Sequence, residues 1–76
     1  MIPNAALINA LRDLDFSFKR QADRVVIYKK AGSTARVNVR RVTLHDEDYC
    51  RILLGQAGMP PDEIELFITN YHCNQH

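Results

Sequence analysis

The spacing of apolar residues predicts that the chain begins with a short helix. Leu7, Leu11 and Leu14 recur at helical spacing. Asn4 precedes them, and its side-chain oxygen is suited to accept a hydrogen bond from the first turn of a helix. We therefore expect a helix that begins at Asn4 and ends near residues 13–15. A helix this short depends on packing against other elements.

The middle of the chain has the period of two that is typical of strands. Residues 16–20 and 35–40 alternate between apolar and polar, and residues 24–30 are β-branched and aromatic at their centre. Gly32 lies in the segment 31–34 and is able to adopt the positive φ of a hairpin turn. The sequence predicts three antiparallel strands in a meander.

The alternation leaves the orientation of the second strand open. Val26 and Tyr28 share one face of this strand, and Val25 and Ile27 share the other. Tyr28 is exposed among the basic residues if the Val25 face is the core, and it is packed if the Val26 face is the core. In the third strand, Val37 and Val39 are expected to point inward.

Two further helices are predicted after residue 42. Residues 43–46 have the sequence pattern of a capping box that begins at Thr43, and Gly58 is positioned as the residue after the first of these helices. The expected apolar faces are Tyr49, Ile52, Leu53 and Ala57 in the first, and Ile64, Phe67, Ile68 and Tyr71 in the second.

This order of elements predicts a single α+β domain over residues 1–76, with residues 72–76 as a flexible tail. We expect a three-stranded antiparallel sheet that helices cover on one face, in the order helix, three strands, helix, helix. A core this small supplies only about 3–5 kcal/mol of net stability. A partner protein is therefore an expected source of further stability.

The composition is typical of a soluble globular protein, with 46% hydrophobic and 25% charged residues. No apolar run approaches the roughly 20 residues that span a bilayer, and residues 1–4 do not resemble a secretory signal. We therefore expect a cytoplasmic protein without a membrane partner. Cys50 and Cys73 are then expected to be reduced thiols.

The net charge of +1 conceals an asymmetry along the chain. Residues 19–41 contain eight basic residues and one acidic residue, a net charge of +7, whereas residues 42–76 carry −5. Such a division predicts a basic binding face with an acidic back, although basic strands also serve solubility alone. A basic open sheet face is compatible with RNA, with DNA or with an acidic protein.

Three stretches of the chain resemble the HicA toxins, small mRNA interferases of toxin–antitoxin modules with a double-stranded-RNA-binding-like fold. The first is the helix at residues 7–11 followed by residues 16–21 with their Arg-Gln ending. The second is the aliphatic–aromatic pair Ile27 and Tyr28. The third and most specific is residues 51–60, Arg-Ile-Leu-Leu-Gly-Gln-Ala-Gly-Met-Pro. The resemblance covers most of the chain.

The resemblance implies RNA as the ligand and a HicB-like antitoxin as a partner. HicA proteins have Gly-x-His directly before the aliphatic–aromatic pair, and this His is credited with RNA cleavage. Here the three positions read Asp23, Arg24 and Val25. Since Val25 cannot transfer a proton, we expect interferase activity to be lost or altered. The residues expected to bind RNA are Arg20, Arg24, Lys30, Arg36, Asn38 and Arg40.

Two other classes of function compete with this interpretation. A protein-interaction module would use the basic sheet to bind an acidic partner. A DNA-binding regulator is the weaker alternative, because the helices after residue 42 are acidic where a recognition helix is basic.

Three histidines are the groups that ionise near neutral pH. His45, beside Asp46, is a weak candidate to replace the missing base, and a partly exposed histidine at a helix start with one backbone hydrogen bond is the more ordinary interpretation. His72, Cys73 and His76 are of metal-ligand type, but no second pair completes a zinc site. We expect no metal and no cofactor.

Overall fold

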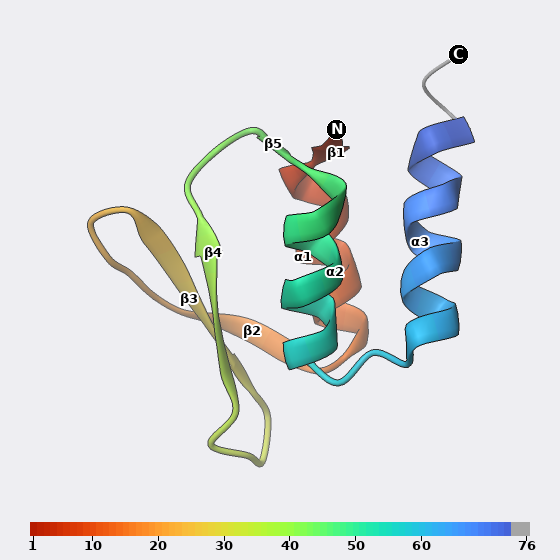
Figure 1. Ribbon diagram of the computed structural model, residues 1–76. Coiled ribbons are helices and arrows are strands. Elements are labelled where there is room, and N and C mark those ends of the chain that lie inside the picture. The colour runs from red at the N-terminus through yellow and green to blue at the C-terminus, as the bar shows by residue number, and fades with distance from the viewer. Residues whose placement is uncertain (74–76) are drawn as a thin grey trace.

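The computed structural model describes the backbone of residues 1–73 and the side chains of residues 1–71. It contains three helices, a three-stranded sheet and a two-stranded sheet (Figure 1). In chain order the elements are β1 (Ile2–Pro3), α1 (Asn4–Asp13), β2 (Phe16–Gln21), β3 (Val25–Lys30), β4 (Arg36–Arg40), β5 (Leu44–His45), α2 (Glu47–Gln56) and α3 (Pro61–Cys73).

The predicted α+β fold is confirmed, and the small sheet is an addition to it. The strands β2, β3 and β4 form an antiparallel sheet in that order. α1 contacts β2, α2 contacts β4, and α3 packs against α2 on the side away from the sheet (Figure 1). The short strands β1 and β5 pair antiparallel, with Ile2 opposite His45. This pairing joins the N-terminus to the segment before α2.

The pairing of β3 with β4 settles which face of β3 is the core. Tyr28 lies opposite Val37, and both valines of β4 are buried. Val26 lies opposite the second of them, Val39. Because directly opposed residues share a face, Tyr28 packs against the core, and Val25 points away from the helices. We call these two surfaces the helix side and the open face of the sheet.

The core lies between the helix side of the sheet and the three helices. Phe16 of β2, Leu7 and Leu11 of α1 and Leu54 of α2 are among its fully buried side chains. The apolar stripe predicted for α3 is also confirmed, with Ile64 and Ile68 buried and Phe67 and Tyr71 partly buried against the core.

The buried face of α2 differs from the prediction by one position. Ile52 is 63% exposed, whereas Cys50 and Leu54 are buried together with the predicted Leu53 and Ala57. Tyr49 packs against the core as predicted, and the helix is turned so that Leu54 points inward in place of Ile52.

α1 begins at Asn4 as predicted, but the capping residues of α1 and α2 differ from the prediction. Pro3, not Asn4, is the N-cap of α1, and the Asn4 side chain bonds to His45 instead of capping the helix. Asp46, not Thr43, is the N-cap of α2, where its carboxylate accepts a hydrogen bond of 2.7 Å from the Tyr49 backbone N–H. The pairing of β5 with β1 holds Leu44 and His45 in a strand, so α2 begins later than a capping box at Thr43 requires.

Both predicted glycine positions are confirmed. Gly32 has a φ of +69° in the turn between β3 and β4. Gly58 has a φ of +95° directly after α2, where it and Met59 donate to the carbonyls of Gly55 and Leu54 in a Schellman motif.

The last helix extends into the segment expected as a tail. α3 continues to Cys73, so the backbone of the first two tail residues is helical. Residues 74–76 and the side chains of His72 and Cys73 lie outside the described part of the chain. No helix within residues 1–73 is both long enough and apolar enough to cross a membrane.

Candidate nucleic-acid interface

The open face of the sheet carries basic and polar side chains in register across the three strands. The side chains of the open face point in the same direction as Val25, away from the helices, as the strand pairing shows. Ser17, Lys29 and Arg36 form one row, Arg20, Ile27 and Asn38 the next, and Val25 and Arg40 the last.

A β-bulge in β2 brings an additional cation to this face. Strict alternation from Phe16 would place Lys19 on the open face and Arg20 on the helix side. The register shifts between Phe18 and Arg20, so that Arg20 lies opposite Ile27. The extra residue of the bulge is Lys19, and two consecutive cations therefore lie on one face.

The result is a cluster of four cations on the open face, which we call the basic cluster: Lys19, Arg20, Lys29 and Arg36. Partial desolvation lowers the pKa of the Lys19 ammonium, and the positive charges of Arg36, Lys29 and Arg20 lower it further. Among the described residues, Arg51 forms salt bridges with Asp48 and Glu65, and neither pair involves a member of this cluster. The cluster therefore has an excess of positive charge that no carboxylate neutralises by an ion pair.

Ile27 lies at the centre of the open face and is nevertheless only 9% exposed. It does not belong to the core between the sheet and the helices. Its cover therefore comes from neighbouring side chains of the open face, whose aliphatic stems can lie along an apolar surface while their charged ends remain in water. The charged groups of the basic cluster consequently surround an apolar centre.

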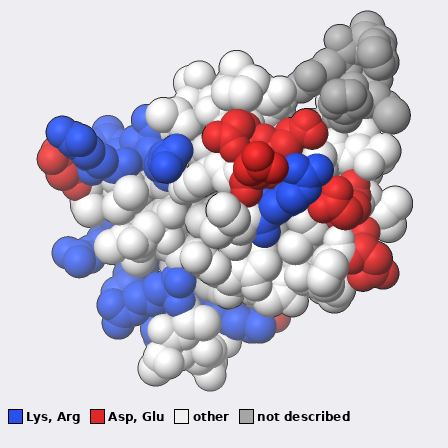
Figure 2. Space-filling view, in the orientation of Figure 1, with Lys and Arg blue, Asp and Glu red and all other residues white. Residues whose placement is uncertain are grey.

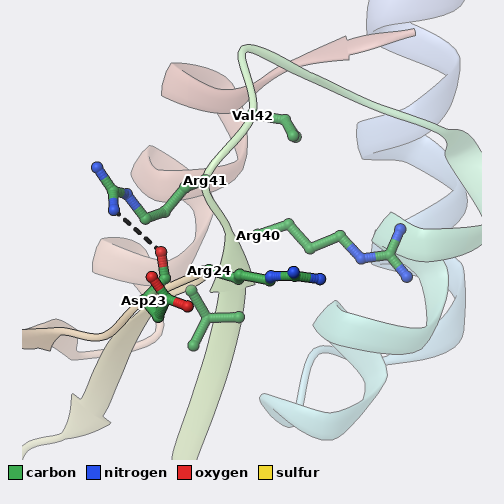
Figure 3. A pocket seen from close by; sticks show the side chains of 6 residues that line it. Asp23, Arg24, Arg40, Arg41 and Val42 are labelled. Atoms are coloured by element: carbon green, nitrogen blue, oxygen red, sulfur yellow. Dashed lines mark hydrogen bonds between the residues drawn. The ribbon is translucent and has the colours of Figure 1, made fainter.

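Arg40 has the register of the open face, but its guanidinium group is turned toward α2 (Figure 3). Its guanidinium carbon lies 4.5 Å from the centre of the Tyr49 ring, a cation–π contact. The Tyr49 hydroxyl accepts a 3.1 Å hydrogen bond from the Arg40 backbone N–H and donates one of 3.1 Å to the Asn38 carbonyl. The Tyr49 hydroxyl thus pairs with two backbone groups at the outer edge of β4. The Tyr49 ring also holds the Arg40 guanidinium group beside it.

A depression of about 530 Å³ lies beyond the last row of the open face, and three arginines contribute to it. Arg24 and Arg40 extend to the same side, whereas Arg41 points away from them (Figure 3). Arg41 donates a 3.1 Å hydrogen bond to the Asp23 carbonyl. The three guanidinium groups therefore do not converge on one ligand. The lining consists of Asp23, Arg24, Val25, Arg40, Arg41 and Val42.

The structure divides the six residues that the sequence predicts as an RNA-binding set. Arg20, Arg36 and Asn38 lie together on the open face. Lys30 lies opposite buried Phe16 and has the register of the helix side. Arg24 precedes β3 and extends to the side on which Arg40 meets Tyr49 (Figure 3).

Two members of the basic cluster were missed by the sequence analysis. Lys29 alternates with Ile27 and Val25, so the period of two would have placed it on the open face once the orientation of β3 was known. Lys19 is brought together with Arg20 by the bulge, and nothing in the local sequence indicates where a strand of this composition carries an extra residue.

His45 is a buried structural residue. It is 2% exposed, its Nε2 lies 2.8 Å from the Asn4 Oδ1, and its ring stacks on Tyr49 at 5.2 Å between centroids. Burial lowers its pKa, the positive charge of Arg40 lowers it further, and Asp46 acts in the opposite direction. The prediction of a partly exposed histidine at this position is therefore wrong. The buried His45 side chain does not reach a ligand on the open face.

The Cys50 side chain is also buried. The Cys50 thiol lies in the core, and burial raises its pKa to about 11, so that it stays protonated at neutral pH. Among the described residues, no group of three or more His, Cys, Asp or Glu side chains is placed to hold a metal ion.

Most of the acidic residues lie on a different part of the molecule from the basic cluster. In Figure 2, Lys and Arg gather over the sheet, whereas Asp and Glu gather over α2 and α3. Arg51 lies among these acids, where it forms ion pairs at 2.9 Å with both Asp48 and Glu65. The division of charge along the sequence is therefore also a division in space.

Comparisons of the chain with protein-family models, with curated proteins and with solved structures found no match. The resemblance to HicA toxins therefore stays a prediction.

Proposed function

We propose that this chain is a HicA-like RNA-binding protein of a toxin–antitoxin type module, acting in the cytoplasm, with lost or altered mRNA interferase activity. The observation that carries this proposal is the basic cluster on an open sheet face. Lys29 and Arg36 lie directly opposite each other on neighbouring strands. Like charges in this arrangement destabilise a sheet, and a bound polyanion offsets that cost.

The chemistry of the open face favours contacts to the nucleic-acid backbone. Its side chains supply cations and the polar groups of Ser17 and Asn38, which suit phosphates and ribose hydroxyls. The aromatic residues of the sheet, Phe16, Phe18 and Tyr28, have the register of the helix side. Without an aromatic side chain in its register, the open face has no platform for stacked bases. A duplex presents the matching surface, because it exposes phosphates and keeps its bases stacked inside.

The absence of a general base supports the loss of interferase chemistry. RNA cleavage without a metal needs a base and an acid near the phosphate. Val25 lies on the open face, at the position where HicA proteins have their histidine, and it cannot ionise. His45 is buried and bonded to Asn4. Among the side chains that the structure describes, the open face therefore supplies cations for binding but no histidine or carboxylate to act as the base.

Binding of an RNA duplex of about 16 base pairs at increasing salt tests the proposal. Four phosphate contacts predict a log–log slope of roughly −3 to −4, or about 10²-fold weaker binding on going from about 50 to about 200 mM salt. Affinity that does not change over this range would rule out a phosphate-binding face. A DNA duplex of the same sequence is the comparison for specificity, and equal binding of both would contradict a preference for RNA.

Lys29 and its neighbour Lys30 provide a matched pair of variants. Lys29→Gln and Lys30→Gln remove the same charge from the same strand, but only Lys29 has the register of the open face. With a blunt duplex, which contacts the open face alone, we expect Lys29→Gln to reduce the salt slope by about one and Lys30→Gln to leave it nearly unchanged. Equal effects of the two variants would show that net charge, and not this face, determines binding.

The same resemblance implies a HicB-like antitoxin as a partner. An acidic protein surface fits the basic cluster through the same charges and is the alternative ligand of the open face. Stoichiometric co-purification of an acidic protein that nuclease does not remove, together with no affinity for RNA, would favour the protein-interaction function instead.

A further inference from the structure

Phe18 is an aromatic side chain of the sheet that the core does not cover. It is 60% exposed, although its register places it on the helix side opposite Tyr28. The two rings meet edge to face, with centroids 6.4 Å apart and an interplanar angle of 83°. Since Tyr28 is itself packed against the core, it supports one edge of the Phe18 ring while much of that ring remains open to solvent.

Lysines surround this exposed ring. Phe18 contributes to a depression of about 420 Å³ that lies where β2 begins and β3 ends. No carboxylate contributes to its lining. The lining consists of Ser17, Phe18, Lys19, Lys29, Lys30 and Ala31.

The depression adjoins the basic cluster and lies at an edge of the sheet. Lys19 and Lys29 belong to both the depression and the basic cluster. β2 is an outer strand of the sheet, so a ligand that leaves the open face passes around β2 to reach Phe18. Lysine side chains therefore continue from the open face around β2 to the exposed ring of Phe18.

We propose that Phe18 stacks on an unpaired base of the bound RNA, beside the segment whose phosphates the basic cluster holds. An aromatic face next to several lysines fits a nucleotide, because the ring stacks on the base and the ammonium groups meet the adjoining phosphates. The inference rests on the proposed function and adds to it a preference for one form of RNA. The preferred ligand is a duplex that continues into a short single strand, rather than a blunt duplex.

Binding of two RNA duplexes that share one sequence tests this proposal. One duplex is blunt, and the other carries a short overhang that contains the fluorescent base 2-aminopurine. We expect the wild-type protein to prefer the overhang duplex by roughly 5- to 100-fold and to change the 2-aminopurine fluorescence by stacking. The overhang is placed at the 3′ end in one series and at the 5′ end in another, because the path around β2 does not define strand polarity.

Three variants assign the effect to the ring. Phe18→Leu keeps an apolar side chain but removes the aromatic face, and we expect it to abolish the preference for the overhang. Phe18→Tyr keeps the ring and is expected to retain the preference. Leu66→Ala, at a similarly exposed apolar residue on α3, is the control and is expected to bind like the wild type.

The outcomes separate this proposal from the proposed function. If the wild type and Phe18→Leu show the same salt-dependent affinity for both duplexes, the basic cluster binds RNA and the role of Phe18 is refuted. If the wild type binds neither duplex, the proposed function fails and the role of Phe18 fails with it. Loss of the preference in Phe18→Leu, with the salt slope unchanged, supports both.

Discussion

The two faces of the same three-stranded sheet are built from opposite chemistry. On the helix side, Phe16, Val37 and Val39 are buried against the helices. On the open face, Lys29 lies opposite Arg36, and the bulge adds Arg20 beside Lys19. The helix side lowers the free energy of the fold by burying apolar surface, whereas the open face raises it by bringing like charges together. The proposed binding of RNA would offset this cost.

The largest expected effect concerns the helix side. Phe16→Ala should destabilise the protein by about 3–5 kcal/mol, because it opens a cavity in the core. Ile27→Ala, on the open face, should cost only about 2 kcal/mol, because long side chains can close over the space. Urea denaturation measures both values. An equal loss for the two variants would show that both faces are packed alike.

The next effect concerns chemistry on the open face. Val25→His places an ionisable imidazole on the face that carries the basic cluster, and general base catalysis then increases RNA cleavage by about 10²-fold or more over the wild type. Val26→His, one residue away and facing the helix side, is the matched control and should show no gain. Cleavage of labelled RNA in the absence of metal measures the rates.

Efficient cleavage by the wild-type protein would contradict this account of Val25. If His45→Ala then abolished that cleavage, the reactive group would be His45, and the burial of its ring would have to be relieved when RNA binds.

A smaller effect concerns the pH dependence of stability. The pKa of His45 is lower in the folded protein than its ordinary value of 6.5, through burial and the charge of Arg40. The unfolded chain therefore binds the proton more tightly. The contribution of His45 to stability is complete above pH 6.5 and decreases as the pH falls from there toward the folded pKa. Comparing the wild type with His45→Gln by urea denaturation between pH 7.5 and 5 isolates this slope, and identical slopes would contradict it.

The smallest expected effect is a gain in the stability of the folded protein when one charge is removed from the open face. Lys29→Gln removes the like-charge pair with Arg36 and should stabilise the folded protein by about 0.2–1 kcal/mol while it weakens RNA binding. Lys30→Gln, which lacks that opposed cation, should give no such gain. Thermal unfolding at low salt is the measurement, because salt screens the repulsion. A loss of stability in Lys29→Gln would show that Lys29 serves the fold.

Much of the fold follows from local patterns in the sequence. The helical spacing of Leu7 and Leu11 and the alternation in residues 36–40 each identify an element from its own residues. Gly32 and Gly58 mark chain reversals because both require a positive φ. The unequal distribution of charge along the chain also carried over to the structure, since most of the basic residues fall in the strands and most of the acidic residues in the helices.

The details of the candidate site depend on contacts between distant segments. The face of β3 was undetermined until its pairing with β4 placed Tyr28 opposite Val37. His45 is buried because it meets Asn4, 41 residues earlier in the chain. Arg40 leaves the open face because α2 brings Tyr49 beside it.

The sequence by itself determined where the three helices, the strands β2, β3 and β4 and the turns marked by glycine lie, because periodicity and backbone preference act over a few neighbouring residues. Only the tertiary structure decided which side of the sheet the helices cover and where the register of β2 slips. Both depend on how separate elements fit together, and a shift of one residue moves a side chain such as Arg20 to the opposite face. The basic cluster is therefore a product of strand pairing.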